Sequence, residues 1–354
     1  MEGLARGERR VMVPFIDLHC DTLTQASLHF HDDLFSLPFT ALDVKRLGNG
    51  GAKAQAFAVC LPQESTVKKL GLLYEGDWKH IKRLAGILYN TARMHPNEIG
   101  ILEKAEDLDK NWSEGRISAI LTVEDGREIQ GDLRMIHRYF RLGVRILTLT
   151  WNNENCFGYP NSMDPEIMGK GLTEFGREGV RYMNKIGMIV DVSHLSDGGF
   201  WDVAAMSRES HKPFIASHSN CRALCDHPRN LSDEMIREIG ETGGVIGMNQ
   251  YPLFLNEGES RRGGFCLIPR GLRKRFEKNS LDEMVDHLRH MVEIGGIDCA
   301  ALGSDFDGMG GKLCLKGPQD YQKLADRLSE EFSSEEVEKI FHGNIERVMR
   351  ETLP

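Results

Sequence analysis

The chain has 354 residues, of which 40% are hydrophobic, so it is long enough to bury a large core. Its formal net charge is −9, and its charged residues, 27% of the total, are of both signs. This acidic balance argues against nucleic acid and against anionic membrane surfaces as partners.

Short β-rich apolar runs alternate with helical patterns along almost the whole chain. The runs carry a dense core of Val, Ile, Leu, Ala and Phe, as strands do when both of their faces are covered. There are eight of them: FIDLHCD (15–21), AKAQAFAV (52–59), ISAILTVED (117–125), RILTLTWN (145–152), MIVDVSH (188–194), PFIASHSN (213–220), GVIGMNQY (244–251) and CAALGSDFD (299–307).

Amphipathic stretches of helical length separate these runs. Two of them span 77–95, before the third run, and 169–187, before the fifth. The stretch 280–296 begins with Ser280 as a helix N-cap and ends at a pair of glycines. The tail 333–351 opens with a Ser-x-x-Glu capping box and indicates two closing helical segments.

Eight strands alternating with helices in a chain of this length favour a single α/β domain, a (β/α)₈ TIM barrel. A doubly wound open sheet is the alternative, but no GxGxxG or P-loop follows the first run. We therefore expect one barrel domain over 1–354, with 1–12 as an N-terminal extension. The stretch 252–279 predicts a long loop inserted after the seventh strand.

Eight cysteines occur, none of them in a CxxC pair, and in a reducing compartment they are interpreted as small buried hydrophobic side chains. Cys221 and Cys225 could form half of a metal site, but no second pair lies near them in the sequence. No run is apolar for long enough to cross a bilayer, and no secretory signal precedes the first run. We expect a cytoplasmic protein without a membrane anchor.

Residues able to bind a metal or move a proton stand at the C-terminal ends of five of the eight runs. In a barrel, these ends form the face on which active sites lie. The residues are His19 and Asp21, Glu124, His194, His218 and Asp305. Taken alone, each is more simply interpreted as a buried ion pair or a satisfied core residue. Five coincident strand ends instead predict a metal site, and imidazole and carboxylate are ligand types that suit Zn²⁺.

His19 and Asp21 are two residues apart, so a strand would project both to one face and turn Cys20 away. Asp17 lies too deep in the same strand to reach a metal. Seven other histidines are interpreted as loop or helix residues without a ligand role, namely His29, His31, His80, His137, His227, His287 and His342.

These segments together resemble the membrane (renal-type) dipeptidase family of zinc metallopeptidases, in the amidohydrolase-like superfamily. The resemblance extends from about residue 15 to GNIERVM near the C-terminus, and it implies the same barrel. It is carried, in this order, by His-x-Asp at 19–21, TVEDG at 122–126, DVSH at 191–194, SHSN with PRN at 217–230, and GSDFDG at 303–308.

The resemblance implies a ligand set for two Zn²⁺ ions per chain. His19 and Asp21 would bind one ion, and His194 and His218 would bind the other. Glu124 and a water or hydroxide would bridge the two ions.

Further roles follow from the same resemblance. Asp305 matches the catalytic acid/base, with Asp307 as a neighbour that caps or orients the loop. Arg229 matches an arginine that holds the substrate carboxylate through a planar two-pronged contact, which lysine would not reproduce. Tyr251 matches a tyrosine that lines the pocket.

One position departs from the family. Where the animal enzymes carry a histidine after LTLT, thought to steady the scissile carbonyl oxygen, this chain has Trp151 followed by Asn152. An indole N–H can donate one hydrogen bond but cannot carry a charge. Either Asn152 or a zinc ion takes over that role, or the substrate preference differs.

The sequence thus predicts a metallodipeptidase that hydrolyses small dipeptides, with a metal-bridging hydroxide as the nucleophile and Asp305 as the proton carrier. Whether L,D-dipeptides or β-lactams are also substrates stays open, and a homodimer is expected because relatives often pair. One alternative is another binuclear amidohydrolase, acting on a cyclic amide, a lactone or a phosphoester. The other is a barrel that has lost catalysis and serves as a binding partner, which the complete ligand set disfavours.

Overall fold

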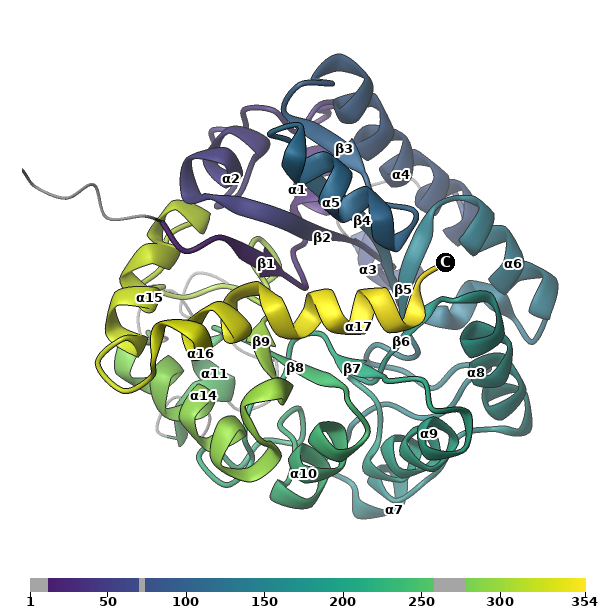
Figure 1. The fold of residues 1–354 in the computed structure, drawn as a ribbon. Helices are drawn as coiled ribbons and strands as arrows, with labels where there is room; N and C mark the ends of the chain where they lie inside the picture. Colours follow the sequence, from purple (N-terminus) through teal and green to yellow (C-terminus); the bar gives the residue numbers. More distant parts are fainter. Residues whose placement is uncertain (1–11, 70–73, 258–277) are drawn as a thin grey trace, which may run out of the picture.

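The computed structural model describes residues 12–69, 74–257 and 278–354. Eight parallel strands close into a barrel with helices around it, which confirms the predicted (β/α)₈ fold (Figure 1). The ring closes because β2 pairs with both β1 and β4, and β1 pairs in turn with β9. The barrel strands are β1 (Phe15–Asp17), β2 (Ala52–Cys60), β4 (Ile117–Glu124), β5 (Val144–Thr148), β6 (Ile189–Asp191), β7 (Ile215–Ala216), β8 (Val245–Met248) and β9 (Ala300–Leu302).

Each of the eight predicted runs overlaps one of these strands. A ninth strand, β3 (Ile99–Ile101), was not predicted. It pairs with the first residues of β4, on the same side of β4 as β5, which pairs with the later residues of that strand. It has three residues, too few to show a period or a dense apolar run.

Small and β-branched side chains fill the barrel interior. Ile16, Ala54 and Ile120 belong to this inner cluster, together with residues of the other strands. Helix α17 (Asn344–Thr352) crosses the N-terminal opening of the barrel, and its Val348 and Met349 pack onto the same cluster (Figure 1). The closed N-terminal end leaves the C-terminal ends of the strands as the face for a site.

The outer helices follow the predicted pattern. The helix predicted at 77–95 is α4 (Asp77–Met94), that at 169–187 is α8 (Glu174–Ile186), and that at 280–296 is α14 (Leu281–Gly295), whose capping box joins Ser280 and Glu283. The remaining helices are α1 (Thr22–Leu28), α2 (Val44–Gly50), α3 (Glu64–Lys69), α5 (Ala105–Ser113), η1 (Gly126–Ile129), α6 (Leu133–Arg141), α7 (Pro165–Met168), α9 (Asp197–Ser210), α10 (Asp233–Glu241), α11 (Pro252–Leu255), η2 (Ile297–Cys299), η3 (Pro318–Asp320) and α15 (Tyr321–Leu328).

The C-terminal tail forms two helical segments, as predicted. The first is α16 (Ser334–Glu338), which begins at the predicted capping box between Ser333 and Glu336. One wide turn, η4 (Lys339–Gly343), continues it into α17 without a break.

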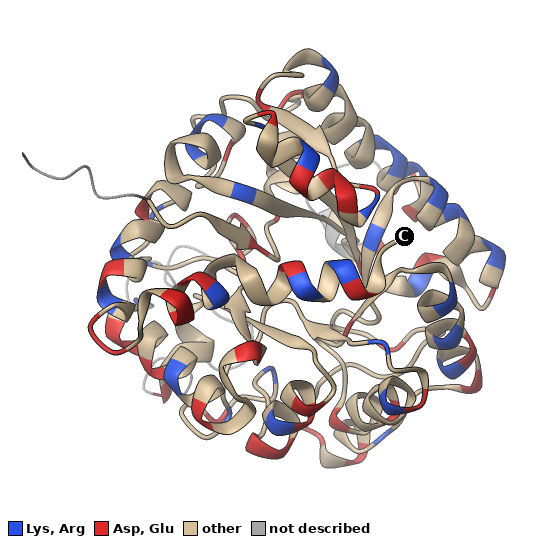
Figure 2. Ribbon diagram, in the orientation of Figure 1, with Lys and Arg blue, Asp and Glu red and all other residues tan. Residues whose placement is uncertain are grey.

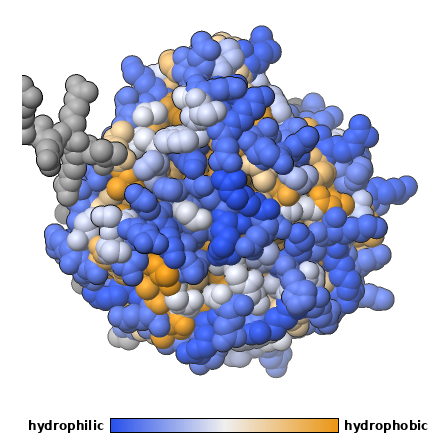
Figure 3. Space-filling model, in the orientation of Figure 1, coloured by the Kyte–Doolittle hydropathy of each residue, from blue (hydrophilic) through white to orange (hydrophobic). Residues whose placement is uncertain are grey.

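The molecular surface is polar and mixed in charge. In the view of Figure 2, Lys and Arg are interspersed with Asp and Glu over the outer helices. The same face is mostly hydrophilic in Figure 3, with small apolar patches. Within the described residues, no helix combines the length and the apolarity needed to span a membrane.

Two predictions fall largely on residues outside those that the structure describes. The predicted insertion 252–279 begins with α11, but residues 258–277 are not described. The predicted N-terminal extension 1–12 is described at residue 12 alone. Both features, and the extent of a single domain over 1–354, stay predictions.

Candidate metal centre

The segment that follows β1 carries His19 and Asp21 into the mouth of the barrel. Regular strand structure ends at Asp17, two residues before the predicted pair, but the chain continues beside the segment after β9. The backbone N–H of Asp305 donates to the carbonyl of His19, and that of Asp21 donates to the carbonyl of Phe306. Both side chains are therefore held next to the end of β9.

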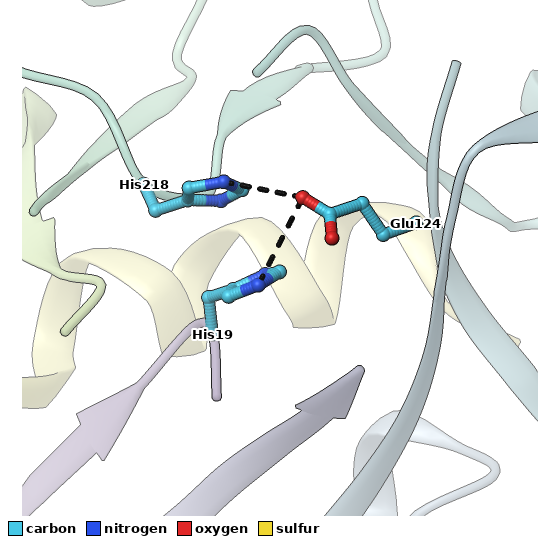
Figure 4. A group of neighbouring side chains, drawn as sticks. All are labelled: His19, Glu124 and His218. Atoms are coloured by element: carbon cyan, nitrogen blue, oxygen red, sulfur yellow. Dashed lines mark ion pairs between the residues drawn. The ribbon is translucent and has the colours of Figure 1, made fainter. Parts of the chain in front are cut away.

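Three imidazoles converge on one carboxylate oxygen. Oε1 of Glu124 lies 3.1 Å from Nε2 of His194, 3.4 Å from Nε2 of His218 and 4.0 Å from Nε2 of His19. Figure 4 shows His19 and His218 pointing at this oxygen from two separate segments. The structure thus brings together residues that are up to 199 positions apart in the chain; His19, Glu124 and His218 are buried, and His194 is partly buried.

Two more carboxylates complete the group. Oδ2 of Asp21 lies 3.6 Å from Nε2 of His19. Ligand atoms of His19, Asp21 and Asp305 all lie within 4.8 Å of one another, as do those of His19, Glu124 and His218. Among the described residues, no histidine outside the predicted set belongs to such a group.

The residues present fit a bound metal. Nε2 of His19 is buried and has no hydrogen-bond partner among the described residues. The Nε2 atoms of His194 and His218 lie 3.1 Å apart, although both also face the carboxylate of Glu124. Imidazole nitrogens and carboxylate oxygens that are crowded in this way, without protein donors between them, are the ligand set of a divalent cation such as Zn²⁺.

The proton on His218 can be assigned from its neighbours. Ser217 Oγ donates to Asp191 at 2.6 Å, so the 2.7 Å contact between Ser217 Oγ and His218 Nδ1 uses the Nδ1 proton of the imidazole. Nε2 of His218 then carries no proton, and its lone pair faces Glu124. A lone pair opposite a carboxylate is repulsive unless a cation lies between them, which is again the arrangement of a metal ligand.

The charges of the group perturb one another strongly. Burial alone would raise the pKa of Glu124, but the neighbouring His19, His194 and His218 hold it well below its ordinary value. Burial lowers the pKa of His19, yet Glu124, Asp21 and Asp305 outweigh it and raise that pKa to about 10. The carboxylates therefore hold positive charge at this point of the barrel.

His194 and His218 behave in the opposite way. Burial lowers the pKa of His194 to about 4 and the pKa of His218 well below its ordinary value, and the positive charge of Arg229 acts in the same direction. Both imidazoles are thus neutral at physiological pH. Neutral imidazole is the form that binds metals.

Asp305 is the third carboxylate of the group. Burial raises its pKa to about 7, with further contributions from Asp21 and Glu124. Its Oδ2 accepts a hydrogen bond of 3.0 Å from Nδ2 of Asn249, which fixes the orientation of the carboxyl group. Asp307 faces away from the group and accepts hydrogen bonds from Thr22 Oγ1 and the Ala41 N–H, as expected for a residue that orients its loop.

The strand ends turn sharply at the centre. His194 and Asp305 have φ of 69° and 62°, and Asp125, directly after Glu124, has φ of 90°. Left-handed backbone is unfavourable for residues other than glycine and gathers at functional sites, where surrounding contacts impose it. Here it turns each functional side chain toward the mouth of the barrel.

Arg229 lies beside the centre and donates to a neighbouring hydroxyl and a backbone carbonyl. Its guanidinium is buried, and it donates to Ser219 Oγ at 3.2 Å and to the carbonyl of His218 at 3.0 Å. Burial lowers its pKa to about 10. Within residues 12–69, 74–257 and 278–354, no carboxylate forms an ion pair with it, and its Nε has no hydrogen-bond partner. A buried, unbalanced guanidinium can accept an anionic group of a ligand.

The three predicted pocket residues lie at different distances from the centre. The ring of Trp151 is partly buried, with its centroid 6.5 Å from that of His194. Tyr251 packs its ring edge-to-face on Phe254, over which the guanidinium of Arg229 also lies. Asn152 is exposed at the same turn as Trp151.

Sequence reasoning missed three contributors. Asn249 orients Asp305 through a hydrogen bond, and Asp191 orients His218 through Ser217. Both act on residues far away in the sequence, and their only local signal is a polar residue in an apolar run. Cys60 ends β2 one residue beyond the predicted run, and its Sγ groups with Asp21 and Glu124 within 4.8 Å. Burial and the two carboxylates raise the pKa of its thiol well above the ordinary value.

This chain is similar to several known proteins. The model of the membrane dipeptidase family (peptidase family M19) matches residues 8–353. Dipeptidase tcpJ of Claviceps purpurea is 30% identical over 318 residues, which cover 88% of this chain and 69% of that protein. An uncharacterized dipeptidase of Schizosaccharomyces pombe is 29% identical over 263 residues, 72% of this chain and 58% of that protein.

A solved structure has the same fold. The crystal structure of the dipeptidase AC, described as a metallo peptidase of family M19, has a TM-score of 0.82 and 25% identity to this chain. The alignment covers 97% of this chain and 99% of the other.

Proposed function

Because the chain belongs to the membrane dipeptidase family (peptidase family M19), we propose that it is a dipeptidase whose centre holds two Zn²⁺ ions. Membership of this family makes it a metal-dependent hydrolase of peptide bonds. One observation carries the finer proposal: the imidazoles of His19, His194 and His218 converge on a single oxygen of Glu124.

The proposed ligands divide into two sets around Glu124. His19 and Asp21 would hold one ion, and His194 and His218 would hold the other. Glu124 would bridge the two, because its carboxylate lies within 4.0 Å of all three imidazoles. When bound, two divalent ions supply Lewis acidity, which lowers the pKa of a water molecule and polarises a carbonyl group.

The remaining residues position the substrate and move protons. Arg229 would bind the free carboxylate of a dipeptide, since its guanidinium is buried beside the centre and forms no ion pair with a carboxylate of the described residues. Asp305, whose pKa is near neutrality, would accept a proton from the attacking water and deliver it to the departing amine. Trp151, Asn152 and Tyr251 would line the pocket.

Anchoring by Arg229 also explains a preference for short substrates. A free C-terminal carboxylate one residue beyond the scissile bond would occupy the guanidinium, and a longer chain would leave the guanidinium buried and unpaired. The stereochemistry of the C-terminal residue does not enter this argument, so L,L- and L,D-dipeptides are both proposed substrates.

The test is a hydrolysis assay on a panel of L,L- and L,D-dipeptides, with lactones and phosphotriesters beside them. We expect cleavage of dipeptides by the zinc-loaded protein, loss of activity on chelation, and recovery on adding zinc. Activity confined to lactones or phosphotriesters would instead identify another binuclear amidohydrolase. A protein that stays inactive on the whole panel with zinc bound would be a binding barrel.

A further inference from the structure

A thiol lies beside two carboxylates of the candidate metal centre. Cys60 is the last residue of β2 and stands opposite Glu124 in the parallel register of β2 and β4. Its Sγ and carboxylate oxygens of Asp21 and Glu124 all lie within 4.8 Å of one another. Strand β2 therefore brings a possible donor atom to the same level of the barrel as the predicted ligands.

The alternation of side chains along β2 directs Cys60 inward. Ala54 and Ala56 belong to the cluster that fills the barrel, whereas Phe57 and Val59 pack in the outer cluster under the helices. Since side chains on one strand face alternate sides, Cys60 continues the inward row. The earlier members of that row are alanines, and Cys60 is the member that reaches the mouth.

The same two carboxylates flank an unsatisfied imidazole. Nε2 of His19 is buried, has no hydrogen-bond partner among the described residues, and lies 3.6 Å from Asp21 Oδ2 and 4.0 Å from Glu124 Oε1. The imidazole nitrogen of His19 and the sulfur of Cys60 thus each lie beside the same two carboxylates. This set of donors is suited to a cation, and the thiolate is the softest member of it.

We propose that Cys60 is a ligand of the ion held by His19 and Asp21, so that this centre contains one sulfur donor. The inference deepens the proposed metallodipeptidase function and rests on it. Coordination forms one bond between the metal and Sγ, and the thiol proton leaves to solvent, so no oxidant or other reactant is needed. A thiolate at this position selects Zn²⁺, Cd²⁺ or Co²⁺ over Mg²⁺ and Mn²⁺.

Cobalt reconstitution tests the bond directly. Metal-free protein is titrated with Co²⁺ and followed by absorption, because a thiolate bound to Co²⁺ gives a charge-transfer band in the near ultraviolet. We expect this band in the wild type and its loss in Cys60→Ser and Cys60→Ala, while the visible bands of bound Co²⁺ remain. Cys314→Ser is the matched control, since Cys314 is also half-buried and belongs to no described ligand group. It should keep the band.

A wild type that binds Co²⁺ without the band overturns the proposal, whatever the variants do. The proposal also fails if the band survives in both Cys60 variants. Circular dichroism and cobalt stoichiometry establish that the variants are folded and loaded.

Dipeptide hydrolysis by the zinc-loaded wild type separates this inference from the proposed function. Hydrolysis without the band removes the ligand role of Cys60 and leaves the dipeptidase intact. The band without hydrolysis keeps the ligand role and removes the dipeptidase. A wild type that takes up no ion contradicts both.

Discussion

The hydroxyl of Ser217 donates a hydrogen bond of 2.6 Å to the carboxylate of Asp191. The same oxygen lies 2.7 Å from Nδ1 of His218, so the carboxylate at the end of β6 sets the tautomer of an imidazole that follows β7. Asp191 also accepts hydrogen bonds from Thr148 Oγ1 at 2.6 Å and from the N–H of Ser193 at 3.0 Å. Three neighbouring strand ends are therefore joined through one buried carboxylate.

Asp191→Asn should weaken metal binding without removing a ligand. The amide can donate toward Ser217 and reverse the direction of that hydrogen bond, which disfavours the His218 tautomer whose Nε2 faces the centre. Because residues that orient a ligand typically contribute 10- to 100-fold to metal affinity, we expect a loss of about that size, measured by competition with a chromogenic chelator.

The matched control for this prediction is Asp197→Asn. Asp197 is a half-buried carboxylate at the start of α9, the helix after β6, and it forms an ion pair with Arg222. It should leave metal affinity unchanged. Equal affinities for the wild type and Asp191→Asn would show that the hydrogen-bond chain does not control the ligand.

Asp305→Asn should abolish most of the turnover and leave the metal content intact. The amide keeps a similar shape but cannot carry the proton between the attacking water and the departing amine. General acid/base catalysis contributes about 10²- to 10⁴-fold to the rate, so kcat should decrease by a factor within that range. Steady-state kinetics and metal analysis on the same preparation make the measurement.

Asp307→Asn is the neighbouring control for Asp305. Asp307 holds the loop through Thr22 and the Ala41 N–H, so its substitution should lower stability while kcat keeps its order of magnitude. A fully active Asp305→Asn enzyme would remove the proton-transfer role from Asp305.

The barrel was predictable because its strands lie in dense apolar runs of seven to nine residues, and helical patterns separate these runs. Seven of the eight runs extended past their regular strands at the carboxyl end, and these extensions carry all the predicted ligands and Asp305, except Glu124, which is the last residue of β4. His194 and His218 both lie beyond the last residue of β6 and β7. Their convergence on Glu124 follows from the topology of a closed parallel sheet, in which all carboxyl ends meet at one mouth.

The missed contributors depend on contacts that no local pattern records. The cysteine at 60 was interpreted as a buried apolar side chain, and only the pairing of β2 with β4 sets it opposite Glu124. Asn249 and Asp191 act through partners 56 and 26 residues away in the chain. Their signal in the sequence is a polar residue inside an otherwise apolar run.

Arg229→Lys should raise KM for dipeptides with little change in kcat. Lysine keeps a positive charge but loses the planar pair of donors that matches a carboxylate. Hydrogen bonds to charged groups contribute about 1.5–3 kcal/mol, which corresponds to a rise in KM of about 10- to 100-fold. The comparison substrate is the same dipeptide with an amidated C-terminus, which should be poor for the wild type and no poorer for the variant.

Arg222→Lys is the control for Arg229. Arg222 already pairs with Asp197, at 2.7 Å, so it is not available to a substrate carboxylate. Its substitution should leave KM unchanged. If amidation of the substrate and Arg229→Lys raised KM by independent factors that multiply, the guanidinium would not be the group that binds the carboxylate.

His287 should make the protein less stable in mild acid. Its ring is buried, Nδ1 accepts from the Cys221 N–H at 3.1 Å, and Nε2 lies 3.1 Å from the Leu255 carbonyl, to which it donates. Burial lowers its pKa from 6.5 to about 4, with a smaller contribution in the same direction from His290. Between these values the unfolded state binds the proton and the folded state does not, so stability falls as the pH decreases.

We therefore expect His287 to contribute a loss of about 2 kcal/mol in the free energy of unfolding between about pH 7 and pH 5. Urea denaturation at both pH values measures it. His287→Gln keeps a donor and an acceptor but does not titrate in this range. Between pH 7 and pH 5 its free energy of unfolding should therefore fall by about 2 kcal/mol less than that of the wild type. His29→Gln makes the same change of side chain at an exposed position and should keep the full pH dependence of the wild type. Parallel pH profiles for the wild type and His287→Gln would show that the proton is taken up elsewhere.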